Sequence, residues 1–323
     1  MKRKKTWGIS IGILAMLFLT IYIFRDDGTM SDFVSIEGHE QFTKAYDGAM
    51  EGLPEPIESR KIGTDFGEVQ LYKFQENDTL DQMPLLLLPG KGASTPMWEP
   101  NLRYFLEHRP VYTLDLLGEP GLSTETKRIE TAEDQAIWLE QVLEQLPESD
   151  IHLLGLSFGG WSATNVALTF PEKIQSLILV DPVYVFGPIP FKMIIASIPA
   201  SVPIVPKPIR ETMLSYISGG IEMDQSDPTA NLIETGMRTY KSKLPMPKKI
   251  KPEQLAELEM PVLGILAGGS TMHHAEKSYQ TGVVYLQNPN SEMVLFADAS
   301  HAINGEYPEE LVETIESFLG KLK

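Results

Sequence analysis

The feature that most constrains the fold is a serine, Ser157, within the segment Gly155-Leu156-Ser157-Phe158-Gly159-Gly160. An apolar run at residues 151–154 precedes this segment, and a helix-like pattern follows it at residues 161–170. A serine on a tight turn between a strand and a helix has a strained backbone and crowded neighbours, so a small residue must stand two places before it and two places after it. Glycine fills both places. The spacing therefore predicts a strand, a sharp turn and a helix, with the serine hydroxyl exposed above a sheet.

Two further segments stand on either side of this serine in the chain. Upstream, the buried-strand pattern of residues 84–88 runs into the glycine loop Pro89-Gly90-Lys91-Gly92, and downstream His301 follows the last predicted strand at residues 293–296. A glycine loop, a serine and a histidine thus come in this order. Together with residues 90–98 and 115–123, these segments resemble the α/β-hydrolase superfamily, and they look most like its bacterial carboxylesterase-type members. The resemblance extends from about residue 65 to the C-terminus.

The resemblance implies an α/β fold with a mostly parallel, eight-stranded sheet flanked by helices. We expect a first part of the hydrolase core at residues 65–185, a helical cap inserted after the sixth strand at residues 186–256, and a second part of the core at residues 257–323. The predicted cap is rich in proline and methionine, which breaks the rhythm of strands and helices. An insertion at the carboxyl end of a strand would cover the edge where open α/β sheets bind ligands. A surface insertion without a role in binding is the alternative.

The composition excludes several classes of partner and of chemistry. The chain has 323 residues and a formal net charge of −17, so a nucleic acid would be repelled and is not expected as a partner. The sequence contains no cysteine, which excludes disulfides, thiolate metal sites and a cysteine nucleophile. We expect neither a cofactor nor a metal ion.

The N-terminus predicts a membrane anchor. Residues 1–6 are basic, and residues 7–24 contain no charge, which at about 1.5 Å per residue spans roughly 27 Å, close to a hydrocarbon core. The basic end should remain cytoplasmic, which places the catalytic domain outside the cell membrane. Residues 25–64 would form a tether and a helix that packs on the domain. The alternative is a cleaved signal peptide and secretion, although residues 25–30 offer no good pair of small residues to a peptidase.

A serine hydroxyl is a poor nucleophile and needs a base that removes its proton. His301 is the candidate, because it lies in the loop between the last predicted strand and the last predicted helix, as in the superfamily. His152 lies within the strand before Ser157 and is expected to be structural. His273 and His274 are adjacent and receive no role.

Two backbone N–H groups would hold an oxyanion formed at Ser157. One belongs to Phe158 at the start of the helix, and the resemblance assigns the other to Lys91. Here the sequence departs from the family, because Pro89 replaces the histidine that commonly precedes the glycine, so a hydrogen bond that usually stiffens this loop is missing. We expect the Lys91 side chain to be solvated and to contribute only through its backbone.

In most relatives the carboxylate that orients the histidine follows the seventh strand, but here residues 268–276 hold no Asp or Glu at that place. Asp181 stands at the end of the sixth strand, beside the nucleophile strand, and some relatives, haloalkane dehalogenases among them, take their acid from this position. We therefore assign the acid role to Asp181. The alternatives are Glu276, no acid partner at all, or an Asp181 that only caps a turn. Asp298 lies too near His301 in sequence to face the far ring nitrogen.

The predicted function is a membrane-anchored, extracytoplasmic serine hydrolase that acts on a small apolar carboxylic ester. Ser157 would be acylated and then released by water, with His301 as base and then as acid. The same scaffold also supports hydrolysis of amides, thioesters and carbon–carbon bonds, and peracid formation. An alternative from another class is an inactive surface binding protein derived from a hydrolase, which the departure at Pro89 and the missing acid after the seventh strand would favour.

Overall fold

The computed structural model describes residues 28–76, 79, 81–194 and 227–322 of the chain. The predicted anchor at residues 7–24 and residues 195–226 of the predicted cap lie outside the described residues. Within the described ranges, every helix is too short or too polar to cross a bilayer.

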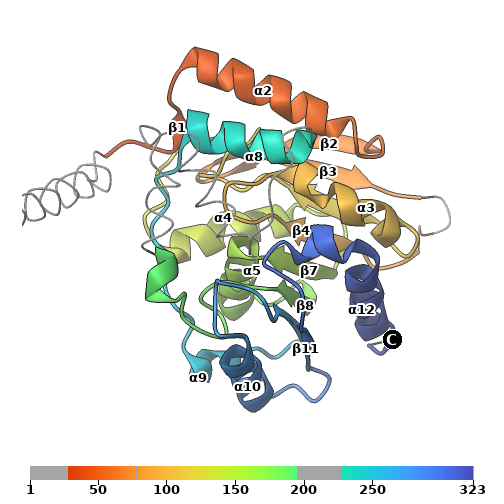
Figure 1. Cartoon of the computed structure of the whole chain (residues 1–323). Coiled ribbons are helices and arrows are strands. Elements are labelled where there is room, and N and C mark those ends of the chain that lie inside the picture. Colours follow the sequence, from red (N-terminus) through yellow and green to blue (C-terminus); the bar gives the residue numbers. More distant parts are fainter. Residues whose placement is uncertain (1–27, 77–78, 80, 195–226, 323) are drawn as a thin grey trace, which may run out of the picture.

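A single twisted sheet carries the site (Figure 1). Its strands follow one another across the sheet in the order β11 (Glu292–Phe296), β10 (Val262–Ala267), β8 (Ile174–Val180), β7 (Ile151–Leu156), β4 (Leu85–Leu88), β5 (Val111–Leu114), β3 (Gly67–Phe74) and β2 (Glu58–Thr64). The six strands from β11 to β5 pair in parallel, whereas β3 runs antiparallel to both of its neighbours. The two-residue strand β6 (Thr124–Glu125) also pairs with β3. The predicted mostly parallel sheet is therefore confirmed, and it begins at β2, seven residues before the expected start of the core at residue 65.

The central strands are mostly apolar, and β4 is entirely so, because helices cover both faces of the sheet. Leu86 and Leu88 of β4 point into a cluster with α4 (Ala132–Glu144) and α5 (Phe158–Thr169). Leu85 and Leu87 point the other way, into a cluster with α3 (Glu99–Leu106) and α12 (Pro308–Gly320). All four leucines are fully buried, and each contributes about 2 kcal/mol through apolar burial. The alternation within β4 thus fixes which helices lie on which face.

The remaining helices lie near the ends and edges of this core. The structure places them at α9 (Pro252–Leu255), α10 (Ala275–Tyr285) and α11 (Ile303–Glu306), with the 3₁₀ helix η2 (Thr95–Trp98) before α3. Tyr279 and Tyr285 of α10 pack on the same cluster as α4 and α5. α11 leads directly into α12, which is the final helix predicted from residue 308.

An N-terminal helix lies alongside part of the predicted cap. α2 (Ile36–Met50) and α8 (Pro228–Thr239) run next to each other at the top of Figure 1. Gly236 of α8 allows this close approach, because a Cβ there would lie 3.2 Å from the Phe42 ring. The two-residue strands β1 (Asp32–Phe33) and β9 (Tyr240–Lys241) extend the contact as an antiparallel pair. A helix was expected within residues 25–64. In the structure this helix packs against α8, in the C-terminal part of the predicted cap.

His152 of β7 is a buried titratable side chain whose structural role can be tested. Its Nδ1 lies 2.8 Å from Ser176 Oγ, and burial, helped by the nearby Arg109 charge, lowers the pKa of the imidazole to about 3. An imidazole in the unfolded chain titrates near 6.5, so the folded state resists a proton that the unfolded state accepts. The free energy of unfolding is therefore fully retained above about pH 6.5 and decreases as the pH falls from there toward 3.

We predict that His152→Gln removes part of this acid dependence, because glutamine does not titrate. Urea unfolding at pH 7.0, 5.5 and 4.5 measures the slope, which a single such group changes by at most about 1.4 kcal/mol per pH unit. His108→Gln is the matched control, because His108 is exposed. An unchanged slope in His152→Gln would contradict the prediction.

Candidate active site

Ser157 occupies the turn between β7 and α5 with φ 55° and ψ −115°, a conformation that a non-glycine residue adopts only at a cost of about 1–3 kcal/mol. Contact distances show why Gly155 and Gly159 must be glycine. A Cβ on Gly155 would lie 2.2 Å from the carbonyl oxygen of Gly159, and one on Gly159 would lie 2.2 Å from the carbonyl oxygen of Leu88. The turn predicted from the spacing is therefore confirmed, and it packs directly on the end of β4.

Three predicted residues meet in one chain of hydrogen bonds. His301 Nε2 lies 2.9 Å from Ser157 Oγ, and His301 Nδ1 lies 2.5 Å from Asp181 Oδ2. Asp181 follows β8, the strand beside β7, and His301 lies in the loop after β11. Since a carboxylate accepts, Nδ1 carries the proton, which leaves the Nε2 lone pair facing the serine hydroxyl. The arrangement can remove a proton from Ser157.

The loop that presents His301 is held on both sides of the histidine. The Ser300 N–H donates to Glu306 Oε2 at 2.6 Å, and the Ala302 N–H donates to Ser300 Oγ at 3.1 Å. The Gly269 N–H donates to the Ala299 carbonyl oxygen at 2.8 Å, which ties the loop to the end of β10. These bonds fix the direction of the imidazole.

Asp181 is fully buried and has φ 43°, which aspartate tolerates better than most residues. Besides His301, its carboxylate accepts from the Ala267 N–H at 2.9 Å, from Ser270 Oγ at 2.6 Å and from His273 Nε2 at 2.5 Å. Burial alone would raise the pKa of this carboxyl, but the hydrogen bonds from His273 and His301 outweigh it and hold the pKa well below its usual range. Asp181 is therefore an anion at neutral pH.

The other acids considered from the sequence lie elsewhere. Glu276 is exposed in the first turn of α10, where it accepts from Gln280, and Asp298 is exposed in the loop before His301. His273, which received no role from the sequence, is in contact with Asp181 instead. The sequence did contain a signal for this contact, because His273 lies in the loop at residues 268–276, which lacks the usual acid.

The two predicted oxyanion donors belong to segments next to the serine. Phe158 is the first residue of α5, and Lys91 follows Gly90, whose Cβ position would lie 3.6 Å from Ser157 Cβ. Among the residues that the structure describes, neither the Phe158 N–H nor the Lys91 N–H donates to an acceptor. Both are thus available to an oxygen bound above Ser157.

Comparison with known proteins agrees with this geometry. A family model described as the alpha/beta hydrolase fold matches residues 83–207. The carboxylesterase YbfK of Bacillus subtilis is 24% identical over 302 residues, which cover 89% of this chain and 96% of that protein. Its crystal structure covers 88% of this chain and 99% of its own with a TM-score of 0.78. The naproxen esterase of Bacillus subtilis, 21% identical, gives a TM-score of 0.77 over 88% of this chain and 99% of that one.

The chain has the α/β-hydrolase fold and is similar to bacterial carboxylesterases over most of its length. The segment matched by the family model contains the loop after β4, the turn at Ser157 and β8, which Asp181 follows.

A buried glutamate holds the loop after β4, a contact that the sequence did not reveal. Glu119 accepts from the Gly92 N–H at 2.7 Å, from Lys91 Nζ at 3.0 Å and from Ser242 Oγ at 3.1 Å. The Lys91 side chain is 62% exposed, as expected of a solvated side chain, but its Nζ also pairs with Glu119 and lies 5.6 Å from the centroid of the Phe158 ring. Glu119 supplies a brace to a loop in which Pro89 replaces the family's histidine.

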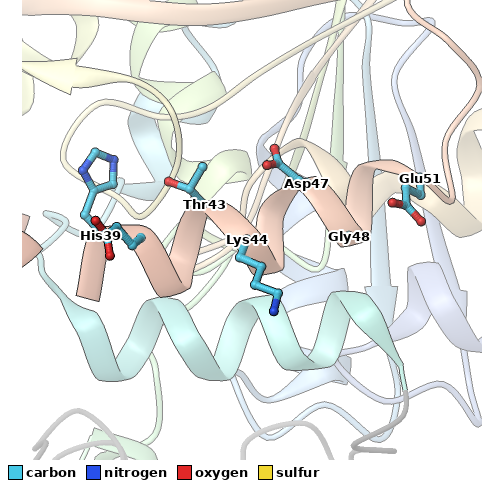
Figure 2. Close-up of a pocket in the computed structure, with 7 residues that line it drawn as sticks. His39, Thr43, Lys44, Asp47, Gly48 and Glu51 are labelled. Atoms are coloured by element: carbon cyan, nitrogen blue, oxygen red, sulfur yellow. The ribbon is translucent and has the colours of Figure 1, made fainter. Parts of the chain in front are cut away.

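A separate surface hollow is lined by none of the site residues. Figure 2 shows its lining, which belongs to α2 and to the residue that follows it and comprises His39, Glu40, Thr43, Lys44, Asp47, Gly48 and Glu51. The residues of the serine, histidine and aspartate chain come from other elements, so the hollow is not part of the candidate active site.

Glu119→Ala should lower kcat for ester hydrolysis by about 10- to 100-fold, because the loop that carries the Lys91 N–H loses its buried acceptor and an oxyanion donor is worth about 10²–10³-fold. Lys91→Met tests the side chain separately, and it should retain kcat within a few-fold because the backbone N–H remains. Steady-state hydrolysis of a p-nitrophenyl ester measures both. A wild-type kcat in Glu119→Ala would show that the brace does not matter for turnover.

Proposed function

We propose that this hydrolase is a serine carboxylesterase with Ser157 as nucleophile, His301 as base and Asp181 as the acid that orients His301. The observation that carries the proposal is the continuous chain of hydrogen bonds from Ser157 Oγ to His301 and from His301 to the buried Asp181. The similarity to Bacillus subtilis proteins named as carboxylesterases supports the same reaction class.

In the proposed acylation step, Ser157 Oγ attacks the ester carbonyl carbon while His301 Nε2 takes the hydroxyl proton. The carbonyl oxygen becomes an oxyanion between the N–H groups of Phe158 and Lys91. The carbon–oxygen bond to the alcohol then breaks, and His301 returns the proton to the leaving alkoxide. Water repeats the sequence on the acyl-enzyme and releases the carboxylic acid. Throughout, the Asp181 anion stabilises the imidazolium.

A small apolar ester is the proposed substrate class. Two apolar side chains of the segment after β8 reach the loops beside the site: Met237 Cε lies 3.7 Å from the Cβ position of Gly92, and Leu244 contacts Gly118. Phe158 and Trp161 stack with ring centroids 5.6 Å apart at the start of α5. The net charge of −17 disfavours a strongly acidic substrate.

Ser157→Ala should abolish ester hydrolysis, and Asp181→Asn should lower kcat by up to about 10⁴-fold, because an amide holds the wrong imidazole tautomer. Covalent labelling by a fluorophosphonate probe, with the modified peptide identified by mass spectrometry, measures the reactivity of Ser157 directly. Glu276→Gln is the control acid and should be unaffected. Labelling that persists in Ser157→Ala, or a stable wild-type protein that is never labelled, would favour the binding-protein alternative over an esterase.

We also propose that residues 7–24 anchor the catalytic domain at the outer side of the cell membrane. The support is the sequence alone: 18 uncharged residues after a basic end. The first described residue, Gly28, lies four residues after this stretch, and the chain then enters β1 and α2.

Full-length protein should fractionate with membranes and retain its original N-terminus, whereas a variant that lacks residues 1–27 should be released. Immunoblotting of membrane and soluble fractions together with N-terminal sequencing measures this. The truncated form should keep its fluorophosphonate labelling at Ser157, because every described residue is retained. Mature protein in the medium that begins after residue 24 would instead support a cleaved signal peptide.

A further inference from the structure

A second histidine contacts the acid of the proposed triad. His273 Nε2 lies 2.5 Å from Asp181 Oδ1, while His301 Nδ1 lies 2.5 Å from the other oxygen, Oδ2. The His273 side chain is only 2% exposed, compared with 13% for His301. One buried carboxylate therefore joins two imidazoles that approach it from different loops, one after β10 and one after β11.

The four donors around Asp181 are divided evenly between its two oxygens. Oδ1 accepts from His273 and from the Ala267 N–H, and Oδ2 accepts from His301 and from Ser270 Oγ. A carboxylate oxygen has two lone-pair sites, so each oxygen has a full set of donors. Because a rotation of the carboxylate would break all four bonds, His273 helps to hold Oδ2 in line with His301.

The surroundings of His273 also determine which of its nitrogens carries a proton. Nε2 must donate, since the ionised carboxylate only accepts. Nδ1 is buried and has no hydrogen-bond partner among the residues that the structure describes, so a second N–H there would be left unpaired at a substantial cost. The imidazole at position 273 is therefore neutral and leaves the full negative charge of Asp181 to His301.

We propose that His273 is a positioning residue for the esterase reaction: as a neutral donor it fixes the Asp181 carboxylate so that His301 stays aligned with Ser157. The inference rests on the proposed function, because it concerns the same triad. It assigns His273 no contact with substrate. Its loss should lower kcat and leave KM nearly unchanged, because it alters the stabilisation of the imidazolium that forms during reaction and not the binding of the ester.

Two substitutions separate hydrogen-bond donation from simple space filling. His273→Leu fills the position with an apolar side chain and leaves Oδ1 with one donor fewer. His273→Gln restores a donor, because the glutamine Nε2 stands the same number of bonds from the backbone as the histidine Nε2. His274→Gln is the matched control, because His274 is adjacent in sequence but exposed.

Steady-state kinetics on a p-nitrophenyl ester and the rate of fluorophosphonate labelling at Ser157 are the readouts. A hydrogen bond to a charged group contributes about 1.5–3 kcal/mol, so we expect His273→Leu to lower kcat and the labelling rate by about 10- to 100-fold. His273→Gln should recover most of this loss, and His274→Gln should match the wild type. Unchanged kcat in His273→Leu, or equal losses in His273→Leu and His273→Gln, would overturn the proposal.

A spectroscopic measurement keeps the test decisive if His273→Leu does not fold. Proton NMR of the full chain with ¹⁵N-labelled histidine should show two far-downfield imidazole N–H signals at neutral pH, one from each histidine that donates to Asp181. His273→Gln should remove one signal and His301→Gln the other. A wild-type spectrum with only one such signal, left unchanged by His273→Gln, would overturn the proposal. Failure of wild-type labelling at Ser157 would instead overturn the proposed function, so the two failures are distinguishable.

Discussion

The buried anion of Asp181 is the interaction on which the site depends. Its carboxylate is fully inaccessible to solvent, and an uncompensated charge in that position would cost several kcal/mol. Four donors supplied by β10, the loop after β10 and the loop after β11 offset this cost. Each loop is consequently held in the position that the chemistry needs by the same bonds that make the buried charge tolerable. Stability and alignment at this site have a common origin.

Backbone strain is concentrated next to this anion. Ser157, Asp181 and Tyr184 all have φ between 43° and 59°, and they lie on the two adjacent turns that follow β7 and β8. The turns support one another, because the Val183 N–H donates to the Ser157 carbonyl oxygen at 3.2 Å and Gly160 lies against Pro182. A strained backbone conformation persists where several surrounding contacts hold it in place, as these contacts do for the two turns.

The sequence predicted those parts of the molecule that depend on local patterns. The glycine spacing around Ser157 and the apolar runs of the central strands follow directly from sterics and burial, and His301 follows from its place after the last strand. Asp181 was assigned from its place at the end of the strand beside the nucleophile strand and from relatives that take their acid there, once the loop at residues 268–276 was seen to lack one. Glu119 and His273 could not be assigned in this way, because their partners are 27 and 92 residues away and an isolated acid or histidine has no periodicity. The packing of α2 on α8 could not be predicted either. The amphipathic pattern of each helix shows that one face is buried, but it does not identify the element that covers this face.

The contacts of Glu119 connect this hidden packing to the reaction centre. α2 lies against α8, β1 pairs with β9, and Ser242, the residue after β9, donates to the same carboxylate that holds the Gly92 N–H. The N-terminal segment is thus joined to the loop that carries the Lys91 N–H through one short series of hydrogen bonds and packed side chains. A displacement of α8 would have to break the bond from Ser242 to Glu119 or move the loop with it. In a chain where Pro89 removes the family's usual brace, the position of the oxyanion donor therefore depends on how the segment after β8 is seated.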